Sequence, residues 1–259
     1  MTSTPIELSM FFKLVNLFSL LLCCSLTFAE QTLQFRTIAV APYGIININN
    51  NEGIYYDLVN TLTDNSILGK NLKINHQIYP YARIIHELKN GQTDLAILFK
   101  YQELEQHVSY ISALPSLPNV VIGLNGNQFE TIQSLEGKTL AYLRGASFSD
   151  LIDTNDRIKR ITTKDFQQGI DLLSVRRVDA IIGPMDPILS AAQSLSKPKD
   201  FFGVPLVVSN RTPWVQISNK SSLISSKDIL KKHFDQILSD GNLDDLRKKY
   251  LSHSRHIIE

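Results

Sequence analysis

Residues 73–99 read KINHQIYPYARIIHELKNGQTDLAILF, and this stretch decides the fold class of the chain. Its first part, over 73–79, alternates apolar and polar side chains, which predicts a half-buried strand. Residues 82–90 place isoleucine and leucine on one helical face, and the helix is expected to end at Gly91. The mainly apolar run 94–99 predicts a second, buried strand. This strand–helix–strand order is typical of α/β layers.

The same alternation of strand and helix patterns extends along most of the chain. After the opening unit comes a polar, proline-containing stretch over 101–118, for which we predict no regular element, and later an Asn-Gly-Asn turn at 125–127. The further elements that we expect are strands at 37–41, 119–124, 139–143, 178–183, 204–208 and 214–217, and helices at 55–62, just after 147, at 165–174 and in two amphipathic segments between 226 and 250. The fold class is therefore predicted to be α/β.

The N-terminal segment has the layout of an export signal. Lys13 precedes the apolar run 14–24, and a short segment then ends in the small residue Ala29. The apolar run is too short to span a bilayer, where about 20 such residues are needed. We therefore expect residues 1–29 to be a signal peptide cleaved after Ala29, with Met10 as an alternative start, and the mature protein to lie in the bacterial periplasm.

Composition argues against several classes of function. Twenty-six lysines and arginines against 25 aspartates and glutamates give a formal net charge of +1 without a long basic block, so nucleic acid is not an expected partner. Both cysteines, Cys23 and Cys24, lie in the expected signal peptide, and the bulky Leu22 argues against a lipid anchor at Cys23. The six histidines show no paired metal spacing, so we expect no bound metal. We also expect no cofactor and no catalytic residue.

Eight short motifs recur in the order and spacing of a known family. They are 53–58 (GIYYDL), 79–83 (YPYAR), 91–96 (GQTDLA), 134–138 (SLEGK), 143–147 (LRGAS), 178–180 (VDA), 241–243 (GNL) and 250–251 (YL). Over residues 34–251 the chain resembles the bacterial solute-binding proteins of the polar-amino-acid type, solute-binding family 3.

The resemblance implies a type II periplasmic-binding fold, in which two α/β lobes are joined by two crossover strands. It places residues 30–122 and 212–259 in a first, discontinuous lobe and residues 123–211 in a second lobe. Two crossovers permit a rigid-body hinge, which we expect near 120–124 and 207–214.

The function implied by the resemblance is capture of a small polar or anionic solute between the lobes. The solute would then pass to an inner-membrane permease of the ABC type, with the protein acting as a monomer. A sensing module of the same fold, acting on a membrane partner, is an open alternative. Because a few proteins of this fold are dehydratases of small acids, a second alternative is an enzyme with Glu103, Glu105 or Asp186 as general acid.

Several candidate ligand-binding residues follow predicted strands, where loops line the crevice of an open α/β sheet. Tyr43 and Tyr81 follow the first two strands, and the family often places an aromatic face over the ligand at these positions. The turn that contains Arg144 and Ser147 follows a strand and precedes a helix, so its free N–H groups would favour an anion. By resemblance Ser147 donates to a ligand carboxylate; a simple helix cap is the alternative.

The family's α-amino-acid clamp is incomplete in this sequence. The resemblance predicts an arginine after the strand 94–99 that grips the ligand carboxylate, but residues 100–107 contain none. Phe99 and Tyr101 stand where hydroxyl side chains are expected, so they join the candidate ligand-binding residues. The family's ammonium-binding acid aligns with Pro184.

Three charged residues could replace the missing groups. Asp186 lies two residues beyond Pro184 and could bind an ammonium if the loop bends differently, and Arg83 or Arg144 could supply a positive charge. Aromatic surface and an anion-favouring turn suit a ligand with a flat or apolar body and at most one anionic group. We therefore expect no tight binding of ordinary L-α-amino acids, because a desolvated ion without a partner costs several kcal/mol.

The N-terminal pattern makes a direct prediction about processing. When the full chain is produced with an export pathway present, we expect the mature protein to begin at Glu30. Intact mass of the exported material measures this. A retained N-terminus, or a mass increment of a lipid on Cys23 or Cys24, would contradict the prediction.

Overall fold

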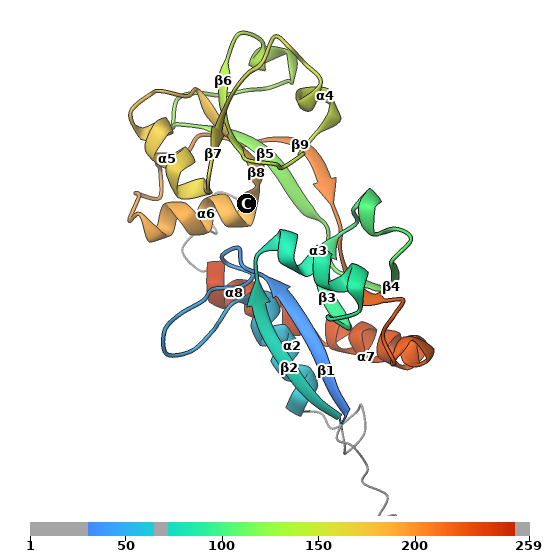
Figure 1. The fold of residues 1–259 in the computed structure, drawn as a ribbon. Coiled ribbons are helices and arrows are strands. Elements are labelled where there is room, and N and C mark those ends of the chain that lie inside the picture. Colours follow the sequence, from blue (N-terminus) through green and yellow to red (C-terminus); the bar gives the residue numbers. More distant parts are fainter. Residues whose placement is uncertain (1–30, 65–71, 252–259) are drawn as a thin grey trace, which may run out of the picture. The chain divides into compact units, whose positions relative to one another are not determined.

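The fold was analysed in a computed structural model of the 259-residue chain, which describes residues 31–64 and 72–251. The described strands form two sheets of five strands each, with helices packed against both (Figure 1). The predicted α/β class with two sheet-based lobes is confirmed. The expected signal peptide lies outside the described residues. Among the helices that the structure describes, none is both long and apolar enough to cross a bilayer.

The first sheet takes strands from both halves of the chain. Its order is β2-β1-β3-β10-β4, in which β1 and β3 are parallel and β10 is antiparallel to both of its neighbours. The strands are β1 (Gln31–Ile38), β2 (Leu72–Tyr79), β3 (Leu95–Phe99), β4 (Val108–Ala113) and β10 (Pro213–Ser218), and the associated helices are α2 (Ile54–Asp64), α3 (Tyr81–Asn90), α7 (Lys227–Ser239) and α8 (Asn242–Leu251).

The second sheet is built from one continuous part of the chain. Its order is β7-β6-β8-β5-β9, in which β6 is parallel to β7 and β8, and β5 is antiparallel to β8 and β9. The strands are β5 (Leu117–Gly123), β6 (Thr139–Leu143), β7 (Lys159–Thr163), β8 (Ala180–Pro184) and β9 (Leu206–Arg211), and the helices are α4 (Asp150–Asp153), α5 (Phe166–Ser174) and α6 (Met185–Ser194).

The chain passes between the sheets twice, through residues 114–116 and through Thr212. The two crossovers lie side by side, because the hydroxyl oxygens of Ser116 and Thr212 are 2.6 Å apart. The expected division at 122/123 falls at the end of β5, and the expected hinge at 120–124 overlaps a strand that is paired on both sides within the second sheet. Within that strand, Leu117 packs in a core of the first sheet, whereas Val120 belongs to the core of the second sheet.

Elements with strong local signals match their predictions. Helix α3 ends at Gly91, which has a φ of 75° and donates its N–H to the carbonyls at the end of the helix. Helix α5 begins where Asp165 accepts a hydrogen bond of 2.8 Å from the backbone of Gln168. Strands β4 and β7 and helix α6 were not predicted. Strand β7 is exposed at four of its five positions, so it lacks the alternation that marks a half-buried strand.

The buried apolar residues form three clusters, two against the first sheet and one in the second sheet, and no buried residue belongs to more than one of them. In the first core the rings of Phe35 from β1 and Phe234 from α7 lie 6.2 Å apart, centroid to centroid. In the second core Gly183 of β8 packs so closely on Phe166 that an added Cβ would lie 2.5 Å from the ring. Separate cores of this kind allow the two lobes to move as rigid bodies.

The first core can be tested at α7, which carries matched buried and exposed positions. Phe234 is 1% exposed, so Phe234→Ala should lower the free energy of unfolding by about 3–5 kcal/mol through lost burial and a residual cavity. Ile229 on the same helix is 58% exposed, and Ile229→Ala should change that free energy by less than about 0.5 kcal/mol. Urea unfolding followed by circular dichroism measures both. Equal losses for the two variants would contradict this packing.

Candidate functional site

The carboxyl ends of strands in the two sheets are joined by side-chain hydrogen bonds, and we call this region the junction. Tyr43, which follows β1, donates to Asp186, which follows β8. Arg211, at the end of β9, donates to the backbone carbonyls of Lys100 after β3 and Ser147 after β6. Loops at the carboxyl ends of strands form the ligand crevice in open α/β sheets, so the junction is the candidate site.

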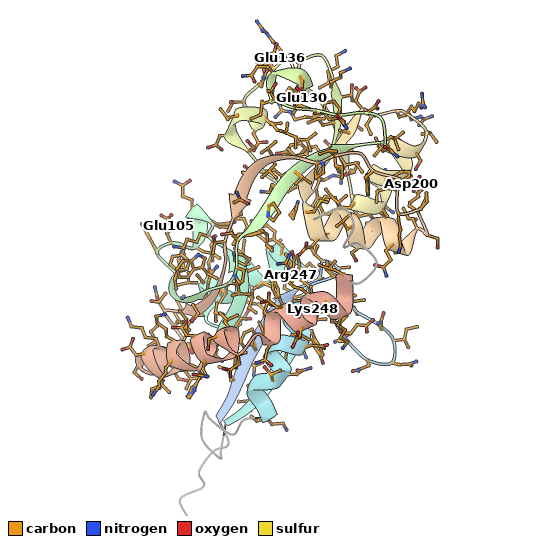
Figure 2. All side chains as sticks on the ribbon, turned by 180° about the vertical axis from the view of Figure 1, so that it is seen from behind. Glu105, Glu130, Glu136, Asp200, Arg247 and Lys248 are labelled. Atoms are coloured by element: carbon orange, nitrogen blue, oxygen red, sulfur yellow. The ribbon has the colours of Figure 1, made fainter. Side chains whose placement is uncertain are left out.

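Asp186 forms the first bridge across the junction. Its side chain is 2% exposed and accepts a hydrogen bond of 3.0 Å from the Tyr43 hydroxyl. Arg247 of α8 completes the site with an ion pair of 3.1 Å between Nη2 and Oδ2. Figure 2 shows Arg247 next to Lys248 on α8, whose ammonium instead pairs with Asp245. The buried carboxylate is therefore neutralised by a cation of the same chain.

Tyr43 is held as a hydrogen-bond donor by its surroundings. Its ring stacks on Tyr55 with centroids 4.5 Å apart and planes inclined by 18°. Burial, and secondly the negative charge of Asp186, raises the pKa of the Tyr43 hydroxyl well above its ordinary value. The hydroxyl stays protonated, which suits the bond that it donates to the carboxylate. The ring expected to face a ligand is thus half of an aromatic pair that supports the bridge.

Arg211 forms the second bridge. Its Nη1 lies 3.2 Å from the Ser147 carbonyl oxygen, and its Nη2 lies 3.3 Å from that of Lys100. The guanidinium carbon is 4.5 Å from the ring centroid of Phe99 and 5.3 Å from that of Tyr101. A guanidinium over ring faces gains cation–π attraction and remains able to donate from its edge. Phe99 and Tyr101 were expected in the site, but Arg211 was not.

Tyr81 extends the aromatic surface on the side of Tyr101. The two rings lie 4.8 Å apart, and burial raises the pKa of Tyr81 to about 12, with added contributions from Tyr101 and Glu103. Glu103 itself is paired with Lys89 at 2.6 Å. The set of Phe99, Tyr81, Tyr101 and Arg211 is called the aromatic cluster below. It offers flat apolar faces beside one cation.

Lys100 adds a second positive charge next to the aromatic cluster. Its ammonium lies 4.3 Å from the ring centroid of Tyr110 and 4.1 Å from that of Trp214. Within the described part of the chain, neither Lys100 nor Arg211 has a carboxylate at ion-pair distance. The exposed Glu105 is close enough to raise the pKa of Tyr110, after the larger effect of burial. The junction near β3 thus carries two unpaired cations.

Arg83 was expected to supply a positive charge to the ligand, and the structure gives it another set of partners. Its Nε donates to Glu87 one helical turn away at 2.8 Å, and its guanidinium lies 3.6 Å from the ring centroid of Tyr79. The side chain is 56% exposed. Arg83 is held along α3 by these two neighbours, and no contact links it to the aromatic cluster among the described residues.

The turn around Ser147 also differs from its expected form. The helix that follows, α4, starts at Asp150 and has only four residues, so the turn does not open a helix of useful length. The Ser147 hydroxyl donates to Asp153 at 2.8 Å, and the N–H of Phe148 donates to the same carboxylate oxygen at 3.2 Å. Arg144 is exposed, and its N–H donates to Thr163. A carboxylate already occupies the N–H and hydroxyl donors that were expected to hold an anion.

The described histidines, aspartates and glutamates form no cluster of three that could hold a metal ion. His76 illustrates the structural use of a histidine: its ring stacks on Tyr56 at 4.4 Å and its Nε2 lies 3.0 Å from the Thr37 hydroxyl. Burial, aided by the charge of Arg36, lowers the pKa of His76 to about 3. The ring is therefore neutral near pH 7 and belongs to the polar packing of β2.

Comparison with known proteins supports this view of the fold. No family model matches the chain. A curated relative, the probable amino-acid-binding protein YxeM of Bacillus subtilis (strain 168), is 21% identical over 191 residues, which is 70% of either chain. A solved structure from work on glutathione import via GshT and the cystine ABC importer TcyBC of Streptococcus mutans has a TM-score of 0.70 at 14% identity and covers 86% of this chain and 96% of that chain.

The chain has the fold of amino-acid-binding proteins of ABC transporters. The similar structures also include the ancestral amino-acid-binding protein AncCDT-1, a precursor of cyclohexadienyl dehydratase, with a TM-score of 0.64 at 17% identity over 85% of this chain and 95% of that chain. The predicted type II periplasmic-binding fold is confirmed by these likenesses. At such identities the likeness concerns the fold alone.

The Asp186 bridge makes a prediction about stability. Arg247→Met should lower the free energy of unfolding by about 3 kcal/mol, because it leaves a buried carboxylate without its cation. In the double variant Arg247→Met, Asp186→Asn the amide needs no cation, so the total loss should fall below the sum of the single losses by about 1–3 kcal/mol. Urea unfolding of all four proteins measures this coupling.

The matched control is Lys248→Met. Lys248 follows Arg247 on α8. Its side chain is 58% exposed and forms a surface ion pair with Asp245. Its loss should change the free energy of unfolding by no more than about 1 kcal/mol. Strict additivity of the Asp186 and Arg247 substitutions would show that the bridge does not hold the carboxylate.

Proposed function

We propose that the chain is an exported solute-binding protein that closes around a small polar or anionic solute and delivers it to a permease of the ABC type. Its lobes correspond to the two sheets with their helices, and the hinge lies along the two crossovers, around residues 114–118 and Thr212. The observation that carries the proposal is the junction: two cores without shared residues are linked by two adjacent crossovers, and the strand ends that face each other carry flat rings and unpaired cations.

Export is part of this proposal. It rests on the signal-like pattern of residues 1–29 and agrees with the extracellular role of ABC-type binding proteins, with which the chain shares its fold. The permease as partner and the monomeric state are likewise proposed from that fold. The proposed division of labour is that this chain binds the solute and the membrane partner moves it.

The ion pairing of the candidate acids favours binding without turnover over a dehydratase reaction. A general acid needs a pKa near the working pH, which usually requires burial without a neighbouring cation. Asp186 is paired with Arg247, and Glu103 is paired with Lys89. Both carboxyl groups thus already have a cationic partner within the chain, and the third candidate acid, Glu105, is exposed. We therefore propose that the likeness to a dehydratase precursor reflects a shared fold and not a shared reaction.

A solute screen with a closure measurement tests the proposed function. The exported protein is mixed with amino acids, amines, organic acids, sugars and small peptides including glutathione, and thermal unfolding is followed. A true ligand at 100 times its Kd should stabilise the fold by about 2.7 kcal/mol, and the same ligand should reduce the radius of gyration in solution scattering.

Sodium chloride at equal ionic strength is the control, since it reproduces screening without a specific contact. The proposal fails if no solute stabilises the protein, or if a stabilising solute leaves the radius of gyration unchanged. Consumption of a stabilising acid, followed by NMR, would show that the chain is an enzyme instead.

A further inference from the structure

Arg211 has N–H groups in the junction that donate no described hydrogen bond. A guanidinium carries five N–H donors, and the described hydrogen bonds use two of them on the carbonyls of Lys100 and Ser147. Both acceptors are neutral, so they orient the fork without neutralising its charge. One carbonyl belongs to each lobe, which fixes the guanidinium at the place where the lobes meet.

Arg211 forms no ion pair with a carboxylate of the described residues. Glu103, which acts on Tyr81 and Tyr101 of the aromatic cluster, forms its ion pair of 2.6 Å with Lys89. Lys100 adds a second cation without an ion-pair partner in the described part of the chain. Two cations without an ion-pair partner, placed beside low-polarity rings, attract an anion. The planar fork of Arg211 matches a carboxylate, which can accept two parallel hydrogen bonds from it.

At the other end of the junction, the described residues offer a ligand ammonium no carboxylate without a partner. Asp186 is the buried carboxylate there, and it already accepts from Tyr43 and pairs with Arg247. An ammonium would have to displace Arg247, whose Nε is itself buried without a hydrogen-bond partner among the described residues. A desolvated ammonium without an acceptor would lose most of the affinity of a micromolar ligand.

We propose that Arg211 grips the carboxylate of the solute, and that the solute is a monocarboxylate with a flat or apolar body and no ammonium group. The body lies against the rings of Tyr81 and Tyr101, and the carboxylate lies at the edge of the guanidinium. This inference rests on the proposed function and names the class of solute that its site binds. It assigns to Arg211 the positive charge that the sequence led us to seek at Arg83 or Arg144.

Matched trios of small molecules test the substrate class. One trio is 3-phenylpropionate, L-phenylalanine and phenethylamine; another is indole-3-propionate, L-tryptophan and tryptamine. Each trio keeps the ring and changes only the charged groups. Thermal unfolding and calorimetry should rank the carboxylate first, with at least a tenfold lower Kd than the amino acid, and the amine last.

Variants of Arg211 test the residue. Arg211→Ala should weaken carboxylate binding by about 10- to 100-fold, the range expected for losing a hydrogen bond to a charged group. Arg211→Lys keeps the charge but loses the fork, so it should recover only part of the affinity. The control is Arg177→Ala: this exposed arginine precedes β8 at the amino edge of the second sheet and should leave Kd unchanged. Ligand-free unfolding midpoints check that each variant is folded.

The outcomes separate this inference from the proposed function. The inference is overturned if an amino acid or amine binds as tightly as its matched carboxylate, if no carboxylate of the trios binds, or if Arg211→Ala and Arg211→Lys both retain full affinity. In each of these cases a stabilising solute from the wider screen would leave the proposed function standing. Absence of any stabilising solute would remove the proposed function itself.

Discussion

The antiparallel pairing of the crossover strands determines where the functional side chains lie. Strand β10 pairs with β3 so that Pro213 stands opposite Phe99, and β9 pairs with β5 so that Arg211 stands opposite Leu117. Because only Thr212 separates β9 from β10, Arg211 emerges beside the end of β3. The backbone ladder thereby delivers a cation from the second sheet to the rings that follow a strand of the first sheet. A shift of the register by one residue would turn the side chain to the other face of the strand.

The charged side chains at the junction have two opposite kinds of surroundings. Asp186 is buried and fully engaged, with Tyr43 and Arg247 both supplied by the first lobe. Arg211 and Lys100 lie over aromatic rings and lack acidic partners in the described chain. A buried ion that already has its counterion contributes to structure, whereas a cation held by neutral groups retains its attraction for a ligand. This contrast explains why Asp186, which the sequence offered only as a possible substitute for the family's acid, is engaged between the two lobes instead.

The same contacts link binding to motion. The Asp186 and Arg211 bridges both cross from one sheet to the other, while the hydrophobic cores remain separate. Breaking a few polar contacts costs far less than opening a core, so in the proposed closure we expect movement to be concentrated at the bridges and at the two crossovers. A solute that takes its place between Arg211 and the rings would add contacts to both lobes at once. Affinity and closure would then arise from the same interactions.

The sequence by itself determined the elements whose signals are local. Strand β6 and helix α3 with its left-handed Gly91 follow from patterns among residues only a few positions apart, and so does the placement of Phe99 and Tyr101 at a strand end. The weaker patterns of β4 and β7 were missed because a strand that is exposed or interrupted by polar residues shows no clear alternation.

The tertiary structure alone decided which charged residues meet. Arg211 lies 111 residues from Lys100 and 64 from Ser147, and Arg247 lies 61 residues from Asp186. No local periodicity encodes such partners, because they depend on strand order and register across the two crossovers. The same reason explains the position of β5: its apolar run predicts a strand, but only its pairing with β8 and β9 places that strand in the second sheet.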